Sequence, residues 1–124
     1  MITGGAGFIG ANLVLHWLRH HPDDLVVNFD ALTYAGNLGN LEDVKELPNY
    51  RFFHGDLRNA LEISKAFSEH NIEAVIHLAA ESHVDRSILV PADFIETNVT
   101  GTFNLLETAR EFWGDDLSKH RILN

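Results

Sequence analysis

Glycine residues near the start of the chain have the spacing of a loop that binds phosphate through its backbone. The segment TGGAGFIG places Gly4, Gly7 and Gly10 three residues apart, while Gly5, Gly7 and Gly10 fit the alternative pattern G-x-G-x-x-G. Either pattern provides a tight turn and a bare backbone that a pyrophosphate can approach. A helix predicted to begin near Phe8 would add the positive field of its N-terminal amides.

An acidic residue lies where it could bind the ribose of a dinucleotide. Asp30 ends the apolar run LVVNFD and stands twenty positions after Gly10. A carboxylate at this point of a β-α-β unit accepts hydrogen bonds from the ribose hydroxyl groups. The next residues, Ala31, Leu32 and Thr33, include no arginine to receive a 2′-phosphate, so the pattern favours NAD over NADP. The alternative is that Asp30 only caps the end of its strand.

A second acidic residue, Asp56, ends the next apolar run, in the segment HGDLRN. Its carboxylate could face the adenine edge of the same cofactor. It could equally be the N-cap of a helix that begins near Asn59, for which Asn59 itself is the other candidate. The sequence leaves both interpretations open.

The runs that carry these residues alternate with segments of helical spacing. Short runs rich in Val, Ile and Phe begin at Leu25, Arg51, Ala74 and Arg121. Helices are predicted between them over residues 9–20, 61–70 and 94–112, with a shorter one over 41–47 and with Pro91 in or near the first turn of the longest. This alternation predicts an α/β protein with a Rossmann-type doubly wound parallel sheet in three αβα layers.

We expect one domain over residues 1–124, an incomplete nucleotide-binding domain without a C-terminal substrate domain. The first strand would be the short segment Met1–Thr3, and the fifth would be the final segment RILN. Two long loops, ALTYAGNLGN and ESHVDRSILVP, follow strands, and ligands usually bind in such loops at the carboxyl ends of parallel strands.

The chain has 124 residues, a net charge of −9 and no cysteine. The charge disfavours nonspecific binding to nucleic acid or anionic lipid, and the lack of cysteine excludes disulfides and thiolate metal sites. No stretch offers the roughly 18 apolar residues of a membrane span. We therefore expect a soluble, cytoplasmic protein without nucleic-acid or membrane partners.

Two of the eight histidines, His16 and His20, have the i, i+4 spacing of a metal-binding pair. Trp17 follows His16 where a zinc helix of the H-E-x-x-H type has glutamate. His20 and His21 also end a predicted helix, where the helix dipole favours imidazolium. We expect no metal site.

The segments TGGAGFIG, DALTYAGN, GDL, HLAAESHVDRS and ETNVTGT, in this order, resemble the extended short-chain dehydrogenase/reductase family. Within it, LTYAGN and HLAAESHVDRSI look like the dTDP-glucose 4,6-dehydratases, which use NAD to make a 4-keto-6-deoxy sugar nucleotide for rhamnose and related sugars. The segment AAESHVDRS is more specific than the glycine loop. The alternatives are another NAD-dependent sugar-nucleotide epimerase or decarboxylase, or a non-catalytic NAD-binding or dimerisation module.

The resemblance implies a set of residues for the cofactor and another for the substrate. The residues expected to bind NAD are Gly4, Gly7, Phe8, Ile9, Gly10, Asp30, Ala31, Leu32, Thr33, Asp56, Leu57, Leu78, Ala79, Ala80, Glu81, Ser82 and Thr97. Ser82 would also lie near the glucosyl group, and His83 and Arg86 are polar candidates for the same dTDP-glucose-type substrate. We expect Asp85 to brace the loop by pairing with Arg86, and Asn98 to organise the site from behind.

The chemistry of that family, as the resemblance implies it, needs a tyrosine base with a lysine four positions later and an acid pair for elimination. Tyr34 and Tyr50 are followed four positions later by Leu38 and His54. We therefore expect no catalytic residue in this chain and no activity of the fragment alone.

The resemblance also implies a homodimer, formed through the predicted helix around Phe94–Phe112. The apolar residues of this helix exceed what one sheet face requires, which is typical of a subunit contact. The alternative is a helix buried in its own core. Because a first strand of three residues supplies few ladder hydrogen bonds, we expect the chain to hold NAD weakly.

Overall fold

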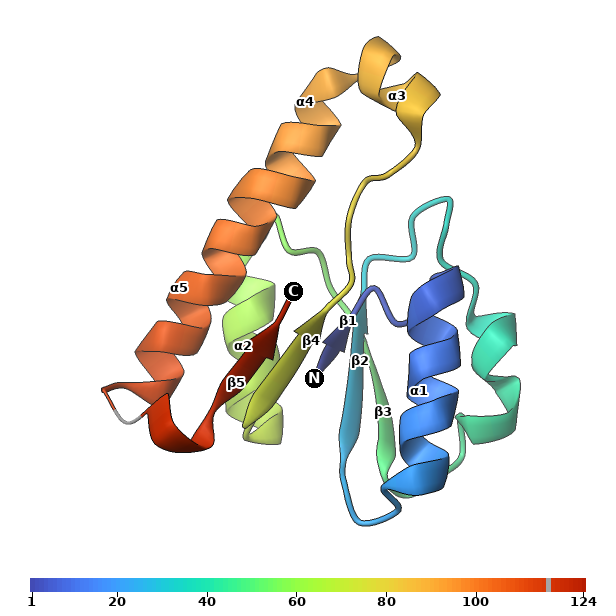
Figure 1. Ribbon diagram of the computed structural model, residues 1–124, viewed down its shortest axis with the longest axis vertical. Helices are drawn as coiled ribbons and strands as arrows, with labels where there is room; N and C mark the ends of the chain where they lie inside the picture. The colour runs from blue at the N-terminus through green and yellow to red at the C-terminus, as the bar shows by residue number, and fades with distance from the viewer. Residues whose placement is uncertain (116) are drawn as a thin grey trace.

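The computed structural model describes residues 1–115 and 117–124, which form a parallel β-sheet between two layers of helices (Figure 1). The strands lie in the order β3-β2-β1-β4-β5. Their bounds are β1 (Ile2–Thr3), β2 (Val26–Asp30), β3 (Tyr50–His54), β4 (Ala74–His77) and β5 (Arg121–Leu123). The predicted doubly wound α/β sheet is confirmed, with its short first strand.

Helices cover the two faces of the sheet in separate groups (Figure 1). One face carries α1 (Phe8–His20) and the 3-10 helix η1 (Leu38–Val44), and the other carries α2 (Ala60–His70) and α5 (Thr102–Trp113). The short helices α3 (Val84–Leu89) and η3 (Leu117–Lys119) lie outside these groups. The short helix predicted over 41–47 is found as a 3-10 helix that begins and ends three residues earlier, because Asn37 accepts a hydrogen bond from the Gly39 amide and caps η1.

The core is divided by the sheet into two apolar clusters. Because side chains alternate along a strand, Val26 packs in the cluster beneath α1 and η1, and Val27 packs in the cluster beneath α2 and α5. Every residue of β2 is buried, as expected for an inner strand covered on both faces. This strand ends at Asp30, so the Asp30 side chain lies at the edge of the sheet where the strands have their C-terminal ends.

The longest helical segment contains the helix predicted over 94–112 and extends it at both ends. It consists of α4 (Pro91–Phe94), the π-helical η2 (Ile95–Gly101) and α5, which follow one another without a break (Figure 1). Pro91 lies in the first turn, as predicted, where its missing amide hydrogen is not needed. The segment buries Leu105 and Ala109 but leaves large apolar side chains exposed, namely Ile95, Val99, Phe103, Leu106 and Phe112. Its own core therefore does not cover the whole helix.

The first strand pairs with both of its neighbours over two residues. Ile2 and Thr3 are in register with Asn28 and Phe29 on β2 and with Ile76 and His77 on β4. Beyond Met1, a cavity of about 710 Å³ lies at the amino ends of β2 and β4, and we call it the second cavity. The α-ammonium of Met1 donates to the Ala74 carbonyl at 2.6 Å, and burial lowers its pKa to about 6.

Candidate functional site

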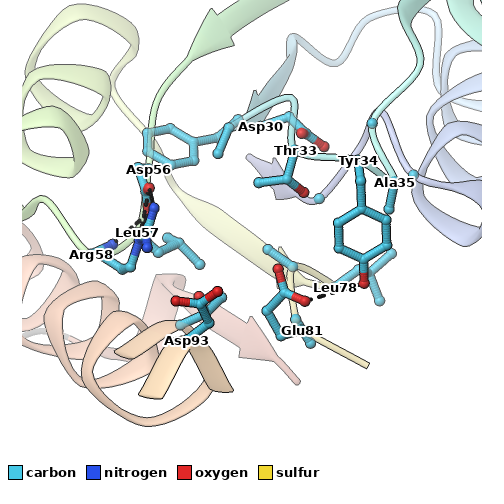
Figure 2. A pocket seen from close by; sticks show the side chains of 18 of the residues that line it. Asp30, Thr33, Tyr34, Ala35, Asp56, Leu57, Arg58, Leu78, Glu81 and Asp93 are labelled. Carbon is cyan, nitrogen blue, oxygen red and sulfur yellow. Dashed lines mark hydrogen bonds and ion pairs between the residues drawn. The ribbon is translucent and has the colours of Figure 1, made fainter. Parts of the chain in front are cut away.

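A groove of about 350 Å³ opens at the carboxyl ends of β1, β2 and β4 (Figure 2). The order of the strands reverses between β1 and β4, and open α/β sheets bind ligands in the crevice at such a point. The predicted site residues that line this groove are Gly4, Gly7, Asp30, Ala31, Thr33, Asp56, Leu57, Leu78, Ala79, Ala80, Glu81, Arg86 and Thr97. The structure thus brings together segments separated by more than sixty residues in the sequence.

The other predicted site residues lie outside the lining of the groove. They are Phe8, Ile9, Gly10, Leu32, Ser82 and His83. Phe8 and Ile9 begin α1 with largely exposed side chains, and Ser82 and His83 are exposed in the loop before α3. Leu32 adopts a φ of 50° in the loop after β2. Contacts of these residues with a ligand therefore remain a prediction.

The glycine loop depends on several close approaches that a side chain would prevent. Gly4 has a φ of 69°, and a Cβ there would lie 2.7 Å from the Ala79 backbone. A Cβ on Gly5 would overlap the Asn28 amide, and one on Gly10 would overlap the Gly4 carbonyl oxygen. Gly7 is the N-cap of α1 and has room around it. Gly4, Gly5 and Gly10 are therefore each needed for a different close contact, whereas Gly7 is not.

The Asp30 carboxylate connects two loops. Its Oδ2 accepts from the Ala6 amide and its Oδ1 from the Leu32 amide, both at 2.8 Å. The residue is 8% exposed, so these bonds form away from bulk water. Each carboxylate oxygen can accept a further hydrogen bond, because it has two lone pairs. Asp30 therefore caps the end of β2 and keeps acceptor capacity for a ligand in the groove.

Asp56 pairs with Arg58 instead of capping a helix. Its Oδ2 lies 2.6 Å from Nη2 of Arg58, and Nε of Arg58 donates to both carboxylate oxygens. This guanidinium holds the pKa of the Asp56 carboxyl below its usual range. The Asn59 side chain accepts from the Leu61 amide and is the N-cap of α2. The capping interpretation of Asp56 is therefore wrong, and its contact with adenine stays a prediction.

On the β4 side, the wall of the groove is formed by backbone, and one side chain holds this backbone in place. The amide of Glu81 donates to Oδ1 of Asn98 at 2.8 Å, and Nδ2 of Asn98 donates to the Glu81 carbonyl at the same distance. Ala79 and Ala80 precede this clamp and present only methyl groups, so a flat ring can lie close to the chain. Asn98 thus lies behind the wall, where the resemblance places it.

A polar bridge joins the loop after β2 to the segment after β4 (Figure 2). The Tyr34 hydroxyl donates to the Glu81 carboxylate at 3.2 Å, and the Arg86 guanidinium lies 4.7 Å from the centre of the Tyr34 ring. Arg86 also lies within ion-pair distance of Glu81 and Asp93. The predicted brace between Asp85 and Arg86 is wrong, because adjacent residues of a helix point in different directions.

Sequence reasoning missed several residues that line the groove. They are Phe29, Tyr34, Ala35, Gly36, Gly55, Arg58 and Asp93. Tyr34 and Gly36 lie within the motif LTYAGN, so the motif marked their loop without marking their contacts. Arg58 lies just before α2 and Asp93 lies in α4. No spacing in the sequence indicates that both side chains line the same groove.

The family is decided by comparison with a family model. The model described as GDP-mannose 4,6 dehydratase matches residues 1–124. The chain belongs to this family. The dTDP-glucose 4,6-dehydratase of Salmonella typhimurium is 55% identical over 113 residues, which are 91% of this chain and 31% of that protein. The corresponding enzyme of Neisseria meningitidis is 52% identical, over 91% of this chain and 32% of its own length.

Solved structures of similar proteins share the fold. A dTDP-glucose 4,6-dehydratase from Streptomyces venezuelae, crystallised with NAD, has a TM-score of 0.82 and 47% identity, and the match covers 90% of this chain and 35% of that one. A UDP-glucose 4-epimerase from Thermus thermophilus, also in complex with NAD, has a TM-score of 0.78 and 34% identity, over 90% and 33%. The chain therefore spans about a third of the length of its relatives.

Among the residues that the structure describes, no group of three or more His, Cys, Asp or Glu side chains could hold a metal ion. The His20 ring contacts the His16 carbonyl and packs 4.2 Å from the His16 ring. None of the described helices is long and apolar enough to cross a bilayer.

Two substitutions in the glycine loop test the close approach of Gly10 to the Gly4 carbonyl. In Gly10→Ala, alanine should gain about 1 kcal/mol of helix propensity but must displace the Gly4 carbonyl, and overpacking costs about 1–3 kcal/mol. We expect urea denaturation to show a net loss of stability. Gly7→Ser is the matched control, because serine is a favourable N-cap residue and its Cβ would have no neighbour nearer than 3.4 Å. A Gly10→Ala protein as stable as the parent would contradict the close approach.

Proposed function

We propose that this chain is the NAD-binding part of a dTDP-glucose 4,6-dehydratase that serves deoxysugar synthesis. The observation that carries the proposal is the groove at the sheet's switch point, in which a glycine loop, a buried strand-end aspartate and a wall of small residues meet. The 55% identity to a dTDP-glucose 4,6-dehydratase supports the substrate class over that of the 34% identical epimerase. A cytoplasmic location is part of the same proposal.

The residues present fit an extended dinucleotide. The amides at the start of α1 and the bare backbone of Gly7 suit a pyrophosphate, which needs donors more than cationic side chains. Asp30 would accept from the adenosine ribose, and Asp56 and Leu57 would lie by the adenine. Ala79 and Ala80 would face the nicotinamide half, with Thr97 opposite. When bound, NAD would take a hydride from the sugar and later return it.

The substrate would lie beyond the nicotinamide half of the groove. Ser82 and His83 are exposed in the loop before α3, where a sugar could reach them. Arg86 lines the groove, and its buried Nε has no hydrogen-bond partner among the residues that the structure describes. These three residues are the chain's candidates for contact with a dTDP-glucose-type ligand.

The two tyrosines do not supply the base of such a reaction. The Tyr50 hydroxyl is buried in β3 and accepts from the Asn28 amide at 3.0 Å, so it does not face the groove. Tyr34 does line the groove, but partial desolvation and its hydrogen bond to Glu81 raise its pKa. A base needs the opposite shift. We propose that the residues of this chain bind and orient the cofactor without completing the reaction.

The cofactor proposal is tested at Asp30. In Asp30→Asn the amide nitrogen cannot accept a hydrogen bond, so we expect calorimetry to show NAD affinity lower by about ten- to a hundredfold. The preference for NAD over NADP should also shrink, because the carboxylate no longer repels a 2′-phosphate. Asp43→Asn, on the exposed surface of η1, is the matched control. Equal NAD affinity and equal preference in Asp30→Asn and the parent would contradict the ribose contact.

We also propose that two copies associate through the face of η2 and α5 that carries the exposed apolar residues. Ile95, Val99 and Phe103 are 59%, 58% and 61% exposed and follow one another at intervals of four. Residues spaced in this way share one side of a helix. Leu61 on α2, which packs beside α5, is 80% exposed and would enlarge the contact.

The dimer proposal predicts a charge-sensitive association. Val99→Glu places a carboxylate in the apolar contact, and we expect sedimentation equilibrium to show monomers. Thr100→Glu adds the same charge at the neighbouring exposed position, which faces another side of the helix, and should leave the dimer intact. A parent chain that stays monomeric up to high micromolar concentration would contradict the proposal.

A further inference from the structure

A chain of hydrogen bonds crosses the core beneath the groove and links three of its walls. Thr3 is fully buried at the end of β1, and its hydroxyl lies 2.6 Å from Nδ1 of His77 on β4. Nε2 of His77 lies 3.0 Å from the hydroxyl of Thr102, at the junction of η2 and α5. The Thr102 hydroxyl in turn donates to the Asn98 carbonyl at 2.8 Å.

The partners at both ends fix which nitrogen of His77 carries the proton. The Thr102 hydroxyl has one hydrogen, which goes to the Asn98 carbonyl, so it must accept from His77. The Thr3 hydroxyl accepts from the amides of Leu78 and Ala79, each at 3.2 Å, so its own hydrogen goes to Nδ1. His77 is therefore neutral, with its hydrogen on Nε2. Its burial also lowers the pKa of the imidazole, which favours the same form.

This chain ends on the residue that holds the groove wall. Asn98, whose carbonyl receives the last hydrogen bond, clamps the Glu81 backbone with its side chain. Thr97, the preceding residue of η2, lines the groove directly. At the other end, Thr3 precedes Gly4, which begins the glycine loop. The position of η2 relative to the glycine loop is thus set through one imidazole.

We propose that His77 is a positioning residue for the groove: as the Nε2-protonated neutral tautomer it fixes η2 against β4, and so holds Asn98, Thr97 and the Glu81 backbone in place. Its role in cofactor binding rests on the proposed function, whereas its role in ordering the wall does not. His77 touches none of the groove itself, since it does not appear among the lining residues.

The tautomer is tested on the unaltered chain. Long-range proton–nitrogen correlation at pH 7 should show His77 with a protonated Nε2 and an unprotonated Nδ1. The opposite tautomer for His77, or a charged ring at pH 7, would overturn the proposal without any variant.

The positioning role is tested at Thr102. Thr102→Val keeps the shape but removes the acceptor, so amide hydrogen exchange at Glu81 should become at least about tenfold faster, and NAD affinity should fall by about tenfold. Thr102→Ser keeps the hydroxyl and should stay within about twofold to threefold of the parent in both. Thr108→Val, a buried threonine on the same α5, should leave Glu81 exchange and NAD affinity unchanged.

The two readouts separate this inference from the proposed function. Faster Glu81 exchange in Thr102→Val supports the positioning role whether or not the parent binds NAD. A parent that binds no NAD would contradict the cofactor proposal and leave the positioning role supported. Equal exchange in Thr102→Val and Thr108→Val overturns the positioning role. Should Thr102→Val fail to fold, His77→Asn serves, because the shorter amide can still accept from Thr3 but no longer reaches Thr102. Unchanged Glu81 exchange in His77→Asn would likewise overturn the positioning role.

Discussion

The close approach of two backbones at the end of β1 is the constraint on which the groove depends. Gly4 lies against the Ala79 backbone so closely that a Cβ would sit 2.7 Å away, and its φ of 69° turns the chain sharply there. Because of this approach, the glycine loop can pass between β2 and β4 and leave a crevice above it. Hydrogen bonds hold the loop on both sides. Asp30 accepts from the Ala6 amide on the β2 side, and the Thr3 hydroxyl hydrogen-bonds His77 on the β4 side.

The electrostatics of the groove follow from the same arrangement. The chain carries a net charge of −9, and the groove contains Asp30, Asp56, Glu81 and Asp93. Its two arginines are already engaged with carboxylates, Arg58 with Asp56 and Arg86 with Glu81 and Asp93. An anionic ligand therefore depends on backbone amides and on the N-terminus of α1 for attraction, which is a short-range field. Such a site recognises a diphosphate by geometry more than by charge.

Features that appear in the sequence as a regular repeat or a fixed spacing could be predicted from it. Alternating apolar runs predicted the parallel sheet, and the glycine spacing with Asp30 predicted which strand ends form the groove. Contacts between side chains far apart in the sequence have no such signal. The bridge between Tyr34 and Arg86 joins a loop to α3, and the choice of Asn59 over Asp56 as helix cap depends on local hydrogen-bond geometry. The chain of hydrogen bonds through His77 was not predicted for the same reason, because neither Thr3 nor Thr102 belongs to a recognisable pattern in its own segment.

We propose that NAD binds in the groove at the carboxyl ends of the strands, and not in the larger second cavity at the opposite edge. This is tested by titrating the isotopically labelled chain with NAD and following its amide chemical shifts. We expect saturable shifts in the glycine loop, in residues 30–33, in residues 78–81 and at Thr97. Shifts confined to Val26, Val27 and Val75 beside the second cavity, or no saturable shift at millimolar NAD, would contradict it.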